Sequence, residues 1–314
     1  MGQELGLEMG QGKEIDYRMV LKAMSVDEKK ELMLLTNHHG LLMLSAHLCL
    51  ITILVYGQSV SEGLVRFCFL VGQGAVMCFL FCAMHEASHG TAFRTKWLNK
   101  FVTNAVGLLL FMGAKWFTYF HNAHHRHTND TARDPELAGG KPDNWLSYLW
   151  YLSGIMIWVQ SFAALVKNAF ATPQADYIPQ SGKHLVQKEA RLMLVFYSMI
   201  FTALIATAAE ALLYYWLLPL LCGQPFLRLF LLAEHTDCPH DDDMLNNSRT
   251  IYTNPVLLAL SWQMPYHTAH HSFPAVPFHK LARFHAFIHH HVKQSSKGYG
   301  VFHHKMIAQY RKRS

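Results

Sequence analysis

The sequence is poor in charged residues. Asp, Glu, Lys and Arg make up only 15% of its 314 residues, against roughly 25% in typical soluble domains. None of them occurs between Glu31 and Glu62, or between Arg66 and Glu86. Each of these intervals is long enough for a helix of about 20 residues, which is the length that crosses a bilayer core. The chain is therefore predicted to be an integral membrane protein.

Two further features are missing. The six cysteines form no CxxC pair and most lie in apolar stretches, where cysteine acts as a small apolar side chain. No disulfide framework is therefore predicted. The basic residues behind the net charge of +6 form no stripe interleaved with aromatics, so nucleic acid is not an expected partner. They gather near the ends of apolar stretches and at the C-terminus, as at a cytoplasmic membrane surface.

The apolar stretches predict an all-α integral membrane fold with about four transmembrane helices in two hairpins. The first hairpin covers about 38 to 57 and 66 to 85, and the second, a tight one, covers 192 to 212 and about 213 to 233. The uncharged stretch from 101 to 114 has the length of a re-entrant or interfacial segment. The stretch from 144 to 166 is expected to lie in the interface or dip into it.

The lysines and arginines also predict how the chain is oriented and organised. They concentrate in the N-terminal segment and around the loop from 167 to 190, which places both on the cytoplasmic side. The expected organisation is an N-terminal cytoplasmic segment (1–34), a membrane domain (35–285) and a basic C-terminal tail (286–314). Interfacial helices and a cytoplasmic histidine-rich cap are expected to accompany the spanning helices.

The chain contains 22 histidines, and several recur at helical spacing. The segments HEASH, HNAHH and HTAHH supply eight of them: His85 and His89; His121, His124 and His125; His267, His270 and His271. Positions i, i+3 and i+4 lie on one side of a helix, so each segment can present its imidazoles together. A catalytic zinc takes three protein ligands. Eight candidate ligands therefore favour two metal ions.

HEASH also matches the HExxH pattern, in which Glu86 would be the general base of a zinc protease. That alternative leaves the other two histidine segments unexplained, but an intramembrane zinc protease stays open. Imidazole binds zinc, copper, iron and nickel alike. A membrane location favours a hydrophobic substrate, and oxidation of saturated hydrocarbon by activated dioxygen favours iron.

The arrangement resembles the integral-membrane fatty acid desaturase family, whose signature is three histidine boxes, HxxxH, HxxHH and HxxHH. HEASH, HNAHH and HTAHH match these boxes in order and spacing, and the flanking HGTAF, DPE and HHSFPAVPFHKL match as well. The resemblance covers about residues 35 to 285. It implies that His235, in AEHTDCPHDDDMLNNSRT, is a ninth ligand and that all boxes face the cytoplasm.

By this resemblance the chain would hold two iron ions in a non-haem di-iron centre and use O2 as co-substrate. The implied function is a membrane-bound oxidoreductase that introduces a double bond into a fatty-acyl or similar lipid-like chain. A hydroxylase of the same superfamily has the same boxes and is the alternative. No HPGG haem segment and no four-cysteine iron site occur. Electrons are therefore expected from a separate ferredoxin-, rubredoxin- or cytochrome-type donor and its reductase.

Carboxylates near the boxes are candidates to support the ligands, because a metal-binding histidine usually donates its second ring N–H to a carboxylate or carbonyl. The candidates are Glu86, Asp134, Glu234 and Asp237. No catalytic residue is predicted beyond the metal ligands. Other histidines are predicted to have no metal role: His285, His289, His290 and His291 are expected to be exposed on an interfacial helix, His303 to lie at the surface or interface, and His47 to be packed in the core.

Overall fold

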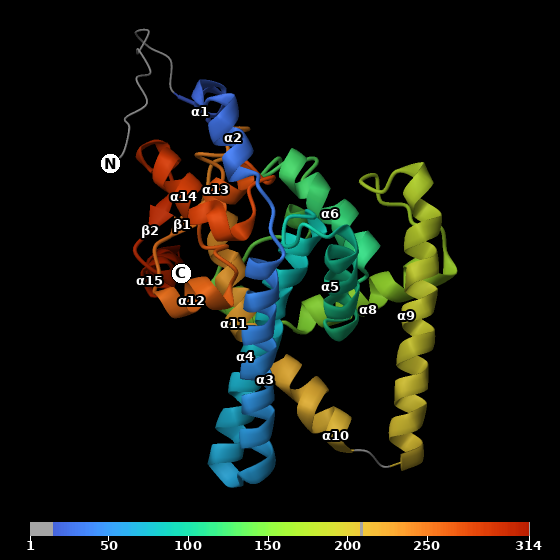
Figure 1. Ribbon diagram of the computed structural model, residues 1–314. Helices are drawn as coiled ribbons and strands as arrows, with labels where there is room; N and C mark the ends of the chain where they lie inside the picture. The colour runs from blue at the N-terminus through green and yellow to red at the C-terminus, as the bar shows by residue number, and fades with distance from the viewer. Residues whose placement is uncertain (1–14, 208–209, 314) are drawn as a thin grey trace.

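The computed structural model describes residues 15–207 and 210–313, which form helices almost throughout (Figure 1). Within these described residues, four helical stretches are long and apolar enough to cross a membrane. They are α3 (His38–Val60), α4 (Gly63–Ser88), α9 (Gln180–Thr207), and the stretch Glu210–His235, which comprises α10 (Glu210–Leu212), the π-helical turn η2 (Leu213–Leu217) and α11 (Leu218–His235). The predicted all-α membrane fold with about four spanning helices is confirmed.

The α3–α4 hairpin packs against α11 at a crossing of small residues. A Cβ atom on Gly74 of α4 would meet the carbonyl of Pro219, and one on Gly223 of α11 would meet the carbonyl of Gly74. Glycine lets helix backbones approach this closely inside a membrane. The crossing brings the C-terminal ends of α4 and α11, with His85 and His235, to the same end of the bundle.

The second pair of spanning helices is splayed, and the expectation of a tight hairpin there is wrong. Figure 1 shows α9 standing apart from α11. Helix α9 packs instead against α6 (Ala114–Arg126) and α8 (Ile155–Phe170).

Two bent pairs of shorter helices occupy the regions expected to be re-entrant or interfacial. Helices α5 (Lys96–Leu109) and α6 meet at 103°, and α7 (Trp145–Ser153) and α8 meet at 54°. Gly154 takes a φ of 67° at the second bend, a left-handed conformation that glycine adopts without strain. Each pair reaches the length and apolarity of a span only when its two helices are taken together. The interfacial placement of these regions stays a prediction.

The remaining elements gather mainly around the end of the bundle where α4 and α11 terminate (Figure 1). They are α1 (Tyr17–Ala23), α2 (Val26–Leu32), η1 (Pro135–Gly139), β1 (Thr250–Ile251), α12 (Pro255–Leu260), α13 (His267–Ser272), α14 (Phe278–Ile288), η3 (His289–His291), β2 (Ser295–Ser296) and α15 (Tyr299–Arg313). Strands β1 and β2 pair in parallel.

Both ends of the described chain pack onto this region. The Tyr17 amide donates a hydrogen bond to Asp243, and Glu31 forms an ion pair with Arg283. The segment predicted as a basic C-terminal tail includes α15, whose residues Phe302, Met306 and Tyr310 are buried. The three-part division of the chain stays a prediction, but its two outer parts contribute helices to the same packed structure.

Candidate metal centre

The nine histidines named from the boxes and the resemblance converge in two groups. The five-histidine group contains His85, His89, His121, His125 and His270. The four-histidine group contains His124, His235, His267 and His271. Within each group, one nitrogen of every ring lies within 4.8 Å of the others. Seven of the nine side chains are buried and the remaining two are half-buried.

Helix geometry explains how the boxes divide between the groups. The i, i+4 pair of the second box, His121 and His125, enters one group, while the intervening His124 enters the other. The third box divides in the same way: His267 and His271 belong to the four-histidine group, and His270 belongs to the five-histidine group. Residues four apart are almost aligned on a helix, whereas the residue at i+3 lies on the adjacent strip of surface. Each HxxHH segment therefore contributes to both groups.

In the five-histidine group the ring nitrogens face one another. The Nε2 atom of His121 lies 2.9 Å from those of both His89 and His125, and the Nε2 atoms of His125 and His270 lie 3.1 Å apart. Among the described residues, the Nδ1 atoms of His85, His125 and His270 are buried without a hydrogen-bond partner.

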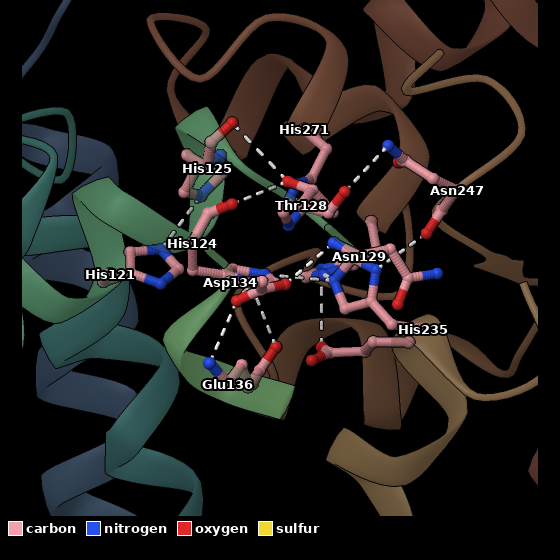
Figure 2. Close-up of polar contacts among 12 residues, drawn as sticks. His121, His124, His125, Thr128, Asn129, Asp134, Glu136, His235, Asn247 and His271 are labelled. Atoms are coloured by element: carbon pink, nitrogen blue, oxygen red, sulfur yellow. Dashed lines mark hydrogen bonds and ion pairs between the residues drawn. The ribbon is translucent and has the colours of Figure 1, made fainter. Parts of the chain in front are cut away.

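The four-histidine group has a surrounding layer of acceptors, part of which Figure 2 shows. The Nε2 atom of His235 lies 3.2 Å from that of His124 and 2.9 Å from that of His267. On the outer side of the rings, His235 Nδ1 lies 2.9 Å from the Asn247 carbonyl, and His271 Nδ1 lies 3.1 Å from the Thr128 hydroxyl. These contacts fix the ring orientations and aim Nε2 of both rings inward.

Carboxylates complete this layer at two histidines. Asp134 places both oxygens 3.0 Å from His124 Nδ1, and Glu234 lies 3.4 Å from His267 Nδ1. Glu136, which the sequence analysis missed, lies 3.2 Å from His124 Nδ1. Glu136 follows Asp134 by two residues in the DPE segment. Its closeness in sequence to a candidate supporting carboxylate was the one sign of its role.

The other two carboxylates lie elsewhere. Glu86 is fully buried, but its Oε1 accepts a hydrogen bond of 2.9 Å from the Phe278 amide. It therefore ties the first box to the start of α14. Asp237 is exposed, with a φ of 58°, in the turn after α11. Its exposure makes it a poor partner for a buried imidazole, and we leave it out of the supporting layer.

The charge states outside the spanning helices suit metal binding. Burial and the neighbouring imidazoles lower the pKa of His267, His270 and His271. These rings are therefore neutral near pH 7, the form that binds a metal. Burial alone would raise the pKa of Glu136, but the nearby His124 and Lys141 bring it to about 2, so this carboxylate is charged.

The two groups are in direct contact. The rings of His125 and His271, one from each group, stack with centroids 4.1 Å apart and planes 17° apart. No protein layer separates the groups at this point.

Three of the six other histidines named from the sequence follow the predictions, whereas His285, His291 and His303 differ, with His291 half-buried rather than exposed. His289 and His290 are exposed, and His47 is buried with Nε2 2.7 Å from the Val76 carbonyl. His285 was predicted to be exposed, but it is buried on the inner face of α14 near Tyr266. His303 was predicted at the surface or interface, but it is buried within the protein, with Nε2 2.9 Å from the Leu229 carbonyl.

Both groups border one cavity of about 660 Å³. His85 and His121 of the five-histidine group line it, as do His124 and His267 of the four-histidine group. Most of the other lining side chains are apolar or aromatic: they include Phe81, Phe111, Trp116, Phe117, Phe120, Trp150, Met156, Met193 and Phe230. A cavity of this size and character is suited to a lipid chain.

These features define a multi-pass membrane protein with a metal-capable polyhistidine centre at an apolar cavity. The family model described as Fatty acid desaturase matches residues 63–303, and the chain belongs to that family. The matched region includes all three boxes and His235. The protein is accordingly an oxidoreductase of lipid substrates. A comparison with curated proteins finds no match.

Proposed function

We propose that this protein is an oxygen-dependent desaturase that holds two non-haem iron ions and introduces a double bond into a fatty-acyl or similar lipid-like chain. The observation that carries the proposal is the convergence of five and four imidazoles in two adjacent groups on one apolar cavity.

The residues fit a pair of metal ions. Facing Nε2 atoms about 3 Å apart are the arrangement that imidazoles take around a shared ion. The unpartnered Nε2 of His271, buried among the four-histidine group, is the ring nitrogen that would complete its set. The nine histidines would be the ligands. Bound there, two irons would supply the activation of dioxygen that hydrogen removal from an unactivated methylene requires.

The protein's own residues orient the histidines, hold the lipid chain and exclude water. Asp134 and Glu136 keep His124 Nδ1 engaged so that Nε2 faces the group. Apolar walls such as Phe117 and Phe230 exclude water and hold the lipid chain beside the histidines. Overall, the substrate loses two hydrogens while one O2, two electrons and two protons are consumed and two waters are formed.

The electrons need an external source, which we propose is a ferredoxin-, rubredoxin- or cytochrome-type donor with its reductase. We also propose that the histidine boxes face the cytoplasm, as the positive-inside pattern predicts. Single cysteines placed at the exposed His290 and Glu62 would test this orientation. Only the His290 site should react with an impermeant thiol reagent on the cytoplasmic side.

A hydroxylase with the same centre is the alternative, since it differs in the fate of the substrate carbon after hydrogen removal. The test is expression in a host of defined lipid content, with an electron donor supplied and mass spectrometry of the extracted lipids. Loss of two mass units supports desaturation, and gain of one oxygen supports hydroxylation. No oxidised product in an iron-replete host would refute both.

Metal analysis of the purified protein separates these enzymes from a zinc protease. We expect about two irons per chain. About one zinc and no iron, together with loss of activity only in Glu86→Gln and not in His267→Ala, would favour the protease. The hydrogen bond from Phe278 to Glu86 argues against a free general base at this position.

A further inference from the structure

Arg228 is a buried cation in a membrane-spanning helix. It lies within α11, has only 7% of its surface exposed, and lines the cavity that the two histidine groups share. Its Nε atom is buried without a hydrogen-bond partner among the described residues, and no ion pair to it occurs among them. A charged side chain inside a membrane protein normally has a partner, and an exception marks a functional position.

The carboxylates along the same cavity are engaged with other groups. Glu136 lies beside His124 and Glu234 beside His267. Glu189 accepts hydrogen bonds from the Lys115 amide at the start of α6. Among the described residues, no carboxylate forms an ion pair or hydrogen bond with this guanidinium, although its charge helps to lower the pKa of Glu136 from a greater distance.

Helix geometry gives the position of this cation relative to the histidines. Arg228 precedes His235 by seven residues, which is two turns, so the two lie on nearly the same face about 10 Å apart along the axis. Side chains lean toward the N-terminus of their helix. The backbone of Arg228 therefore lies deeper in the bundle than that of His235, and its side chain reaches the cavity that both histidine groups border.

We propose that Arg228 binds an anionic oxygen group, of the carboxylate type, on the lipid that occupies the cavity. This inference rests on the proposed function for the nature of the reaction, but not for the binding itself. The planar guanidinium presents paired N–H donors that match a carboxylate. The substrate class it selects is a lipid whose acidic group lies inside the cavity rather than outside the membrane domain.

The test uses the full-length purified protein in phosphatidylcholine nanodiscs and two probes, palmitate and methyl palmitate, that carry the same doxyl quencher. Trp116 and Trp150 line the cavity and report occupancy through their fluorescence. We expect palmitate to bind about 10- to 100-fold more tightly than the ester, the range for a hydrogen bond to a charged group. Arg228→Met should remove this preference, and Arg228→Lys should restore part of it.

Lys141→Met is the matched control, since Lys141 is the other cation that lines the cavity and is only half-buried. It should leave the preference for the acid in place. Equal affinities for both probes in the unmodified protein would overturn the proposal, as would an unchanged preference in Arg228→Met. Loss of the preference in Lys141→Met to the same extent would also overturn it, because the cavity's overall charge would then be responsible.

A stability measurement distinguishes ligand binding from a structural role. If Arg228 is kept for a ligand, removing an unpaired buried charge should raise the melting temperature of delipidated Arg228→Met. A large fall in melting temperature, or failure to fold, would assign Arg228 to the fold and refute the inference. The binding assay needs no oxygen or electrons, so absence of oxidised product with an intact preference would refute the reaction but not the site.

Discussion

Asp134→Asn should weaken the metal affinity of the four-histidine group selectively. In the protein, Asp134 holds His124 Nδ1 between its two oxygens at 3.0 Å and also accepts hydrogen bonds from the backbone amides of Asn129 and Glu136. Asparagine has the same shape but one acceptor oxygen and no charge. His124 therefore loses a charged acceptor that fixes its orientation and raises its basicity as a ligand.

The magnitude follows from the contacts. Removing one supporting partner of a metal-binding histidine costs about 10- to 100-fold in metal affinity, which is about 1.4–2.8 kcal/mol. The effect should lie at the upper end, because the side chains of His124 and Asp134 are only 3% and 1% exposed. Glu136→Gln should have a smaller effect, because the Glu136 side chain is 33% exposed.

The assay is iron retention after dialysis against graded chelator, measured by elemental analysis of the purified protein. Asp134→Asn should lose about one of two irons at a 10- to 100-fold lower chelator concentration than the unmodified protein. Asp237→Asn is the matched control, since Asp237 is an exposed carboxylate from the same set of sequence candidates. Retention curves of Asp134→Asn and the unmodified protein that coincide would refute the supporting role.

Three further substitutions test other parts of the structure. Gly74→Leu should lower unfolding stability by about 1–3 kcal/mol, because a side chain there forces α4 and α11 apart; detergent thermal melts measure this. His270→Ala should abolish product formation and reduce bound iron, whereas His290→Ala, at an exposed position, should change neither. Tyr197→Phe should cost about 1 kcal/mol, because it removes a 2.8 Å hydrogen bond to the Leu108 carbonyl.

Each of these has its own control. Gly72→Leu is the comparison for Gly74, since a Cβ there meets only Leu54 at 3.5 Å; equal losses in both variants would contradict the close crossing. Full iron content and activity in His270→Ala would remove it from the ligand set. For Tyr197, the exposed Tyr56→Phe should leave the melting temperature unchanged, and an equal shift in both would rule out the hydrogen bond as the cause.

The spanning helices could be predicted because a bilayer requires long uncharged stretches. Both predicted segments of the first hairpin fall within α3 and α4 to within a few residues. Helix α9 begins twelve residues before the predicted start at 192, because its first three turns are polar and carry no membrane signal. The splay between α9 and α11 could not be predicted, since it depends on the packing of α9 against α6 and α8.

The spacing of the histidines in the sequence predicted which of them are candidate ligands, but it did not predict how they divide between the two groups. A helix face gathers His121 and His125, yet only the packed arrangement shows that His124 turns to His235, which is 111 residues further along the chain. The burial of His285 and His303 was missed for a similar reason, because it depends on contacts with residues distant in sequence. The carbonyl of Asn247 carries no sequence signal at all.

The stacked rings of His125 and His271 have a consequence for electron transfer. Because these rings belong to different groups and lie in van der Waals contact, electrons delivered to metal ions bound as proposed would cross a short ring-to-ring contact from one group to the other. The two groups also share α6 and α13, so the gap cannot widen unless a helix bends. We therefore expect one docking position for the electron donor to serve the whole centre.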